Sequence, residues 1–374
     1  MNKNKIIDIC TFYPKSKIKA GEGMTHGRFP FYTSSNTLNK YLNSYQIEED
    51  GIILGTGGNA SIHYCSGRFS ASTDCLVICS KNPDIYNEYL YYYLLNSIHI
   101  LENGFRGAGL KHISKKYIED IEINYIPDVN IQKKIINIIN KSKILINKRK
   151  EQIEALDELV KSQFVEMFGD PVKNTMNWEI KKVGDIAFVT KLAGFEYTQY
   201  INYQDKGEVI VVKGLNVKEK KLKLDDVSYI DKATSDLLPR SQLKENDLVM
   251  TYVGINIGDV ALVDGKNRYH LAPNVAKISL LEEANINPIF MVNLLYMSRI
   301  LFSSGATSTA KQALNMGRIR EINIMMPSLE LQEKFAVFAK QVDKLKFEME
   351  KSLKELEDNF NSLMQKAFKG ELFN

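Results

Sequence analysis

The chain contains one pattern twice. In each copy a strand-like segment ends at a proline, a glutamine follows, and a long helical pattern runs to a phenylalanine. The corresponding positions share one constant offset: Pro127 with Pro327, Gln132 with Gln332, and Phe168 with Phe368. Solenoid units are typically ~20–50 residues long, so a repeat with a much longer period indicates a duplicated domain.

The similarity extends upstream at a different offset. Lys5-Ile-Ile-Asp-Ile9 matches Lys182-Val-Gly-Asp-Ile186, so the two globular parts differ in length. The order is therefore globule, long helix, globule, long helix. The predicted domains are residues 1–129, 130–170, 171–328 and 329–374.

The long helical segments predict a coiled coil. Apolar residues step by three and four along each segment, which is the spacing that two helices need to pack side by side. The seam positions are Phe335, Phe338, Val342, Leu345, Met349, Leu356 and Leu363 in the second copy, and Ile131, Ile135, Ile138, Leu145, Leu156, Leu159 and Gln163 in the first. Two helices of equal length favour an antiparallel pair, with the globules at opposite ends about a pseudo-twofold axis. A helix packed only on its own domain does not explain the equal lengths.

The globules are mostly β in character. Short apolar runs punctuated by glycine predict strands in both halves, at residues 51–54, 60–64, 74–78, 209–212, 247–251 and 258–263. Helices are predicted at 86–101 and 287–302, each before the strand that leads into a long helix. The expected class is α+β with a mixed, strongly bent sheet in each globule.

Composition narrows the environment of the protein. The formal net charge is only +4, which neither requires nor excludes nucleic acid. No apolar run approaches the ~18 residues of a membrane span, and the N-terminus lacks a signal-peptide core. We expect a soluble cytoplasmic protein without a membrane partner. The 4 cysteines form no C-x-x-C pair, so reduced core thiols are a better interpretation than zinc coordination with His63.

Motifs for catalysis are missing. None of the 9 prolines adjoins another, although amino-methyltransferases need an Asn/Asp-Pro-Pro motif, and no phosphate-binding loop supports ATP hydrolysis. Gly55-Thr-Gly-Gly-Asn59 precedes a strand and does not fit the dinucleotide pattern. It is either a turn that brings backbone close to a ligand or a plain hairpin. The sequence predicts a non-catalytic protein without a metal site or a bound cofactor.

Several segments carry a family resemblance. The motifs are Phe29-Pro-Phe-Tyr-Thr-Ser-Ser35, residues 52–64 and Phe69-Ser-Ala-Ser-Thr-Asp-Cys75 in the first globule, and Val212-Lys-Gly-Leu-Asn216 and His270-Leu-Ala-Pro-Asn274 in the second. Both globules look like target-recognition domains of the type I restriction-modification specificity subunit, and the two long helices extend the resemblance over essentially the whole chain. The second globule begins at Trp178. The first globule lacks a counterpart of this tryptophan, which predicts a slightly trimmed first domain.

The resemblance implies a function. Such a subunit has no activity of its own and reads a bipartite, asymmetric target in double-stranded DNA, one half-site per globule. It recruits two modification (methyltransferase) subunits, which use S-adenosylmethionine, and two restriction (translocase) subunits, which use ATP and Mg. The length of the helices would set the spacer between the half-sites.

Candidate DNA contacts lie in turns beside glycine, where side chains stand clear of a sheet. In the first globule they are Thr33, Ser34, Ser35, Asn59, His63, Arg68, Arg106 and Lys111. In the second they are Lys191, Tyr197, Lys213, Asn216, Tyr252, Asn256, Arg268, His270, Asn274, Lys311 and Gln312. Lysine and arginine suit phosphate and guanine, whereas asparagine and glutamine suit adenine.

Two other classes remain as alternatives. A two-domain coiled-coil scaffold that binds only proteins predicts no salt-sensitive affinity for DNA, whereas a DNA reader predicts one. A fused nuclease or methyltransferase is the other alternative, and the missing Pro-Pro motif counts against methylation.

Overall fold

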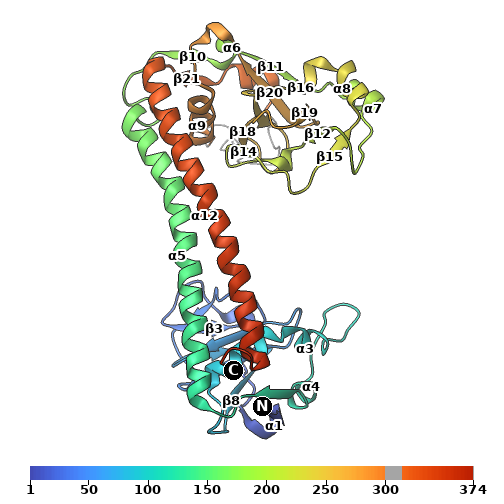
Figure 1. The fold of residues 1–374 in the computed structure, drawn as a ribbon, viewed down its shortest axis with the longest axis vertical. Helices are drawn as coiled ribbons and strands as arrows, with labels where there is room; N and C mark the ends of the chain where they lie inside the picture. The colour runs from blue at the N-terminus through green and yellow to red at the C-terminus, as the bar shows by residue number, and fades with distance from the viewer. Residues whose placement is uncertain (300–313, 374) are drawn as a thin grey trace. The chain divides into compact units, whose positions relative to one another are not determined.

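The computed structural model describes residues 1–299 and 314–373 (Figure 1). The chain divides into two compact units, Met1–Glu151 with Glu350–Asn374, and Gln152–Met349. We call them the first unit and the second unit. The division falls inside both long helices, so each unit joins one globule to adjoining halves of both helices. The division of the chain into four domains stays a prediction.

Two sheets and a strand pair form the globule of the first unit. The antiparallel sheet has the order β2 (Cys10–Phe12), β8 (Cys75–Ser80), β5 (Gly51–Gly55) and β6 (Ile62–Cys65). In the second sheet β3 (Phe29–Tyr32) pairs antiparallel with β4 (Tyr41–Leu42) and parallel with β7 (Ser70–Ala71). The strand pair joins β1 (Asn2–Lys5) to β9 (Glu122–Tyr125). The helices are α1 (Ile6–Ile9), η1 (Ala20–Glu22), α2 (Asn87–Asn96), α3 (Ile98–Glu102) and α4 (Lys115–Glu119).

The second unit repeats these strand pairings and adds β16 and a hairpin. Its antiparallel sheet has the order β11 (Ala187–Lys191), β20 (Val275–Leu280), β17 (Leu248–Thr251) and β18 (Val260–Leu262). Its mixed sheet has the order β15 (Ser228–Ile230), β12 (Val209–Val212), β19 (Arg268–Leu271) and β16 (Gln242–Leu243), and β10 (Ile180–Lys182) pairs with β21 (Asn323–Met325). A hairpin joins β13 (Val217–Lys218) to β14 (Lys221–Leu222). The helices are α6 (Val183–Ile186), α7 (Gly194–Tyr200), η2 (Gly214–Asn216), α8 (Lys232–Leu237), η3 (Pro239–Ser241), η4 (Glu282–Ala284), α9 (Pro288–Ser298) and α11 (Met316–Arg320).

The shared connections confirm the internal repeat and the α+β class. The upstream match is also explained, because Lys5 and Lys182 each end a strand that runs directly into a one-turn helix, α1 or α6. The strand-like patterns at residues 118–127 and 319–327 predict continuous strands from their first residues, and this detail is wrong. Ile118 and Ile319 lie in the short helices α4 and α11, and the strands begin only after a turn.

The long helices are α5 (Val129–Phe168) and α12 (Leu329–Lys369), and they pack antiparallel within each unit. In the first unit the beginning of α5 shares a core with the end of α12, through Ile135, Ile139, Met364 and Ala367. In the second unit the end of α5 shares a core with the beginning of α12, through Leu156, Val160, Ala339 and Val342. Ion pairs join the helices in both units, Lys150–Glu357 at 2.8 Å and Lys346–Asp157 at 2.6 Å.

The seam between the helices differs partly from the prediction. Leu145, Leu159 and Leu345 are about half exposed, whereas Ile146 and Val160 are buried in their place. A straight helix drifts by ~20° per heptad relative to a perfect coiled-coil repeat. Each helix must also turn an apolar face toward the globule at its end, which shifts the buried stripe.

The repeated phenylalanines close the end of each long helix. Phe168 packs against Phe290 of α9 and Phe335 of α12, at ring-centroid distances of 4.8 and 5.6 Å. Phe368 packs against Tyr89 and Tyr93 of α2, at 5.2 and 5.7 Å. Aromatic contacts of this kind add to the stabilisation from burial. Both repeated positions are therefore explained by packing.

The repeated glutamines are fully buried and make equivalent hydrogen bonds. The Gln132 side chain accepts from the backbone N–H of Tyr86 and donates to the carbonyls of Asp84 and Ile126. Gln332 accepts from the N–H of Asn287 and donates to the carbonyls of Asn285 and Pro327. Each side chain thus fixes the start of a long helix against the loop that precedes α2 or α9.

We expect Gln332→Leu to destabilise the second unit by about 3 kcal/mol or more, because it leaves buried backbone groups without partners at ~1–3 kcal/mol each. Urea unfolding of the whole chain measures the change. Lys334→Leu is the matched control, since Lys334 is exposed and pairs with Glu330 of the same helix; it should change stability by about 0.5 kcal/mol or less. An equal effect of both substitutions would contradict the role of Gln332.

Candidate nucleic-acid interface

In the first unit three loops meet at one edge of the globule. β3 and β7 run parallel, so residues 33–35 and 72–74 leave the sheet at the same edge. The turn after β5 joins them through Ser34, whose hydroxyl accepts from the N–H groups of Thr56 and Gly57 at 3.2 and 3.3 Å and donates to the carbonyl of Asp74. Thr33, Ser34 and Ser35 are therefore adjacent to the glycine-rich turn.

A fourth loop, residues 106–112, completes this edge. Arg106 and His112 exchange backbone hydrogen bonds of 2.8 and 2.9 Å, and the N–H of Gly58 donates to the carbonyl of Lys111 at 2.9 Å. The glycine-rich segment is thus more than a plain hairpin, because it is bonded to a loop distant in sequence. Gly58 has a φ of 82°, a backbone conformation that residues with a side chain rarely adopt, and this explains why glycine occupies the position. Asn59, Arg106 and Lys111 are exposed around this assembly.

His63 holds the loop of residues 33–35 in place. Its Nε2 lies 2.6 Å from the carbonyl oxygen of Ser35, and its ring packs against Tyr32 at 5.1 Å. The 4 cysteines are free thiols, and burial raises the pKa of Cys10 to about 12. No group of His, Cys, Asp or Glu in the described part of the chain has the arrangement of a metal site.

The second unit assembles equivalent loops. Residues 213–216 follow β12, 272–274 follow β19, and 252–258 connect β17 to β18. Backbone bonds of 3.0 Å join Ala272 to Val212 and Tyr252 to Asn274. A cleft of about 500 Å³ opens between the loops. The predicted residues that line it are Tyr197, Lys213, Asn256 and Asn274.

Lysines lie against aromatic rings at this cleft and at the neighbouring end of β11. The Lys213 ammonium lies 4.9 Å from the ring centroid of Tyr203 and donates to the Ser228 hydroxyl at 2.6 Å. Lys191 lies 5.5 Å from the ring centroid of Tyr252. Tyr197 packs against Tyr203 at 6.0 Å. Positive charge held beside aromatic rings is suited to a nucleic-acid backbone.

Burial corrects three candidates: Tyr252 is only 8% exposed, and Asn216 and His270 are fully buried. Asn216 donates to the carbonyls of Lys223 and Asp226 and accepts from the N–H of Lys213, so it holds its loop together. His270 lies within β19, and burial lowers the pKa of its imidazole. None of the three side chains is available to touch DNA in this structure.

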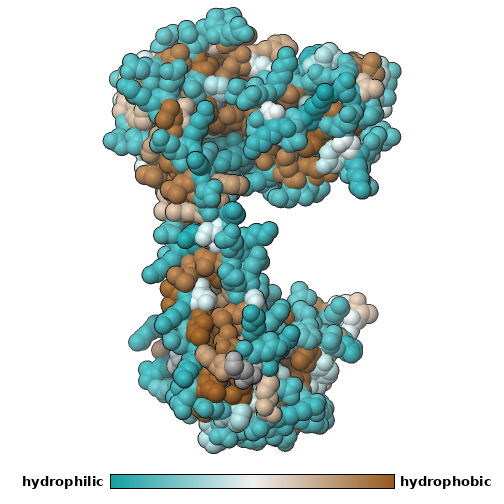
Figure 2. All heavy atoms as spheres, viewed as in Figure 1, coloured by the Kyte–Doolittle hydropathy of each residue, from teal (hydrophilic) through white to brown (hydrophobic). Residues whose placement is uncertain are grey.

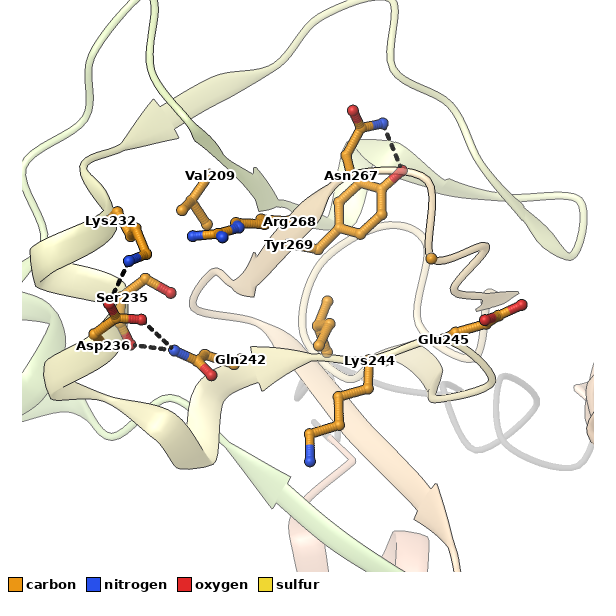
Figure 3. A pocket seen from close by; sticks show the side chains of 12 residues that line it. Val209, Lys232, Ser235, Asp236, Gln242, Lys244, Glu245, Asn267, Arg268 and Tyr269 are labelled. Atoms are coloured by element: carbon orange, nitrogen blue, oxygen red, sulfur yellow. Dashed lines mark hydrogen bonds and ion pairs between the residues drawn. The ribbon is translucent and has the colours of Figure 1, made fainter.

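Two arginines lie at the opposite edge of the sheets. Arg268 begins β19 and faces Val209 at the start of β12, whereas Lys213 follows the end of β12. Arg268 lines a separate cleft of about 510 Å³, beside the Lys232–Asp236 ion pair (Figure 3). Arg68 precedes β7 in the same way and pairs with Glu48. The structure therefore does not bring either arginine together with the loop clusters described above.

Lys311 and Gln312 lie outside the described residues. Tyr203 and Ile255 are not among the predicted contacts, and both line the cleft of the second unit. The run Val253-Gly-Ile-Asn-Ile-Gly258, between two strands, was the available signal for Ile255.

The lysine-rich run 218–223 forms the β13–β14 hairpin. Lys220 donates to Asn293 of α9 at 3.0 Å, and Lys221 pairs with Asp343 of α12 at 3.0 Å. Burial lowers the pKa of Lys220. A run of lysines predicts either a solvated face or a patch that follows DNA phosphates, but these two lysines face the helices instead.

Proteins similar to this chain in sequence are named as type I specificity subunits. A specificity subunit of the type I restriction enzyme MjaVIII from Methanocaldococcus jannaschii is 23% identical over 346 residues, covering 87% of this chain and 79% of the relative. A putative type I specificity subunit from Mycoplasma pneumoniae is 24% identical over 350 residues, covering 89% and 86%.

The fold also matches solved structures. The crystal structure of the type I restriction-modification S subunit from M. genitalium superimposes with a TM-score of 0.62 at 13% identity, covering 98% of this chain and 96% of that one. A structure concerned with complex assembly of the type I R-M system gives 0.61 at 14% identity, covering 99% and 98%. No helix in the described ranges is long and apolar enough to cross a membrane.

The family described as "Type I restriction modification DNA specificity domain" matches residues 1–155 and 176–358, one match in each half of the repeat. With the repeated fold and the two loop clusters, these matches show that the chain belongs to the family of type I restriction-modification DNA specificity domains.

Proposed function

We propose that this chain is the specificity subunit of a type I restriction-modification complex and reads a bipartite, asymmetric DNA target, one half-site with each unit. The observation that carries the proposal is the pair of equivalent loop clusters built from different side chains. The first presents Thr33, Ser35 and Asn59, whereas the second presents Lys213, Asn256 and Asn274. One framework with two sets of contact residues suits two unlike half-sites.

The long helices supply the surface for partner subunits. Apolar side chains lie exposed on them, with exposed fractions of 53% for Ile144, 54% for Leu145, 46% for Leu159 and 64% for Phe347. Figure 2 shows such apolar side chains among hydrophilic ones along the stretch that the helices occupy. Exposed apolar side chains gathered on an element mark an interaction site. Leu145 and Leu345 are exposed at corresponding positions of the repeat, so two modification subunits can bind at equivalent places, and two restriction subunits complete the complex.

The division of chemistry follows from this arrangement. The chain acts without catalysis of its own, in the cytoplasm where the DNA lies. S-adenosylmethionine belongs to the modification subunits, and ATP and Mg belong to the restriction subunits. The competing function is a scaffold that binds only proteins, and affinity for DNA distinguishes the two.

We expect DNA affinity to fall linearly in log–log form as salt rises, with a slope of about 0.9 per phosphate contact. Lys213→Ala should weaken binding to all sequences alike and reduce the slope by about one. Lys232→Ala is the matched control, because Lys232 is an exposed lysine of the same unit that lines the other cleft. Binding of a duplex library to the complex with its modification subunits, at several salt concentrations, measures both effects. Absent or salt-independent binding would favour the scaffold.

A further inference from the structure

In the second unit, the cleft between the loops carries aliphatic side chains at its rim that the described chain leaves partly or almost wholly exposed. Ile255 is 94% exposed, and Leu215 and Val253 beside the same cleft are 44% and 37% exposed. The cleft is otherwise lined by polar groups such as those of Lys213 and Asn274. Ile255 is the most exposed of the large apolar residues described, so packing against residues 1–299 and 314–373 does not explain it.

The loop that carries Ile255 is closed at its base. The N–H of Thr251 donates to the carbonyl of Asp259, and the N–H of Gly258 donates back to the carbonyl of Thr251, both at 2.9 Å. A further bond of 3.1 Å joins Asp259 to Asn256. Gly254 and Gly258 have φ values of 117° and 87°. The loop therefore holds a defined turn and presents Ile255 at its tip.

The surroundings of Ile255 fit DNA better than an apolar partner. Lys213 and Lys191 place positive charge at this edge, against the rings of Tyr203 and Tyr252. Asn256 and Asn274 add amide groups to the lining of the cleft. Among the base edges in the major groove, the 5-methyl of thymine is the one apolar group, and aliphatic side chains recognise it by contact.

We propose that Ile255 contacts the 5-methyl group of a thymine in the half-site read by the second unit, and that it is a specificity-determining residue. The inference rests on the proposed function. The corresponding turn of the first unit, residues 56–61, has Ala60 as its one aliphatic side chain, and Ala60 is buried, so that turn offers no equivalent contact.

The test uses the complex of this chain with its modification subunits. Sequencing of methylated sites first gives the target, and duplexes are then made with each thymine of the second half-site replaced in turn by deoxyuridine, which lacks only the methyl. We expect one replacement to weaken binding by the intact chain about fourfold, because burial of one methyl group contributes ~0.8 kcal/mol to the binding free energy. The same replacement should leave binding by Ile255→Ala unchanged.

Leu237→Ala is the matched control, because Leu237 is 67% exposed and ends α8, whose residues line the other cleft. It should respond to deoxyuridine as the intact chain does. Equal losses for the intact chain and Ile255→Ala, or no loss at any thymine, would overturn the inference and leave the proposed function standing. Failure of the intact complex to bind any specific duplex would instead refute the proposed function.

Discussion

One heptad inserted into both long helices is expected to abolish methylation of the original target and to create a target with a longer spacer. The insertions fall between Glu151 and Gln152 and between Met349 and Glu350, where the two units divide. A heptad preserves the seam and adds about 10 Å at ~1.5 Å per residue. At ~3.4 Å per base pair this corresponds to roughly three base pairs. Methylome sequencing of cells that express the variant complex measures the spacer.

A heptad inserted into α5 alone is the control. The two helices then no longer match in length. The inter-helix contacts of one unit, such as Lys150–Glu357, and those of the other, such as Lys346–Asp157, can therefore not form together. That variant should lose methylation of both targets. An unchanged spacer, or altered half-site bases, in the double insertion would refute the idea that the helices set the spacing.

Exchange of residues 1–127 for the same segment of another family member is expected to replace one half of the methylated motif completely and leave the other half unchanged. The grafted segment must keep two sets of contacts. Aromatic side chains must occupy the positions of Tyr89 and Tyr93, which pack against Phe368. The loop before α2 must offer a backbone N–H and a carbonyl to the side chain of Gln132. Methylome sequencing again gives the result.

The reciprocal exchange of residues 171–327 is the control, and it should change only the other half of the motif. Changes in both halves after either exchange would mean that the two units do not read independently. In that case the equivalent loop clusters would act as one composite site.

The architecture could be predicted from sequence because its signals are local and repeated. The prolines before the long helices, the buried glutamines at Gln132 and Gln332, and the phenylalanines that end each helix all occupy corresponding positions in the structure. The glutamines have a hydrogen-bonding role and the phenylalanines a packing role that a single chain must satisfy twice. Repetition therefore revealed the fold without any knowledge of tertiary contacts.

The site could be predicted only in part, because burial and sheet edges depend on the tertiary structure. Asn216 looked like a loop side chain free to touch a base, yet its amide holds the carbonyls of Lys223 and Asp226. Arg268 lies only a few residues before Asn274, but β19 runs between them and separates them to opposite edges. Sequence spacing does not indicate which end of a parallel strand carries the site.

The order of synthesis has a consequence for the core of the first unit. Met364, Ala367 and Phe368, near the end of the chain, are buried in the same cluster as Ile6 and Tyr89, near its beginning. The second unit, Gln152–Met349, is continuous and is complete before those residues leave the ribosome. Nascent domains generally fold in order from the N-terminus. Here the globule that is synthesised first is the last to complete its core. A chain truncated by a few residues at its C-terminus would therefore leave the core of the N-terminal globule incomplete.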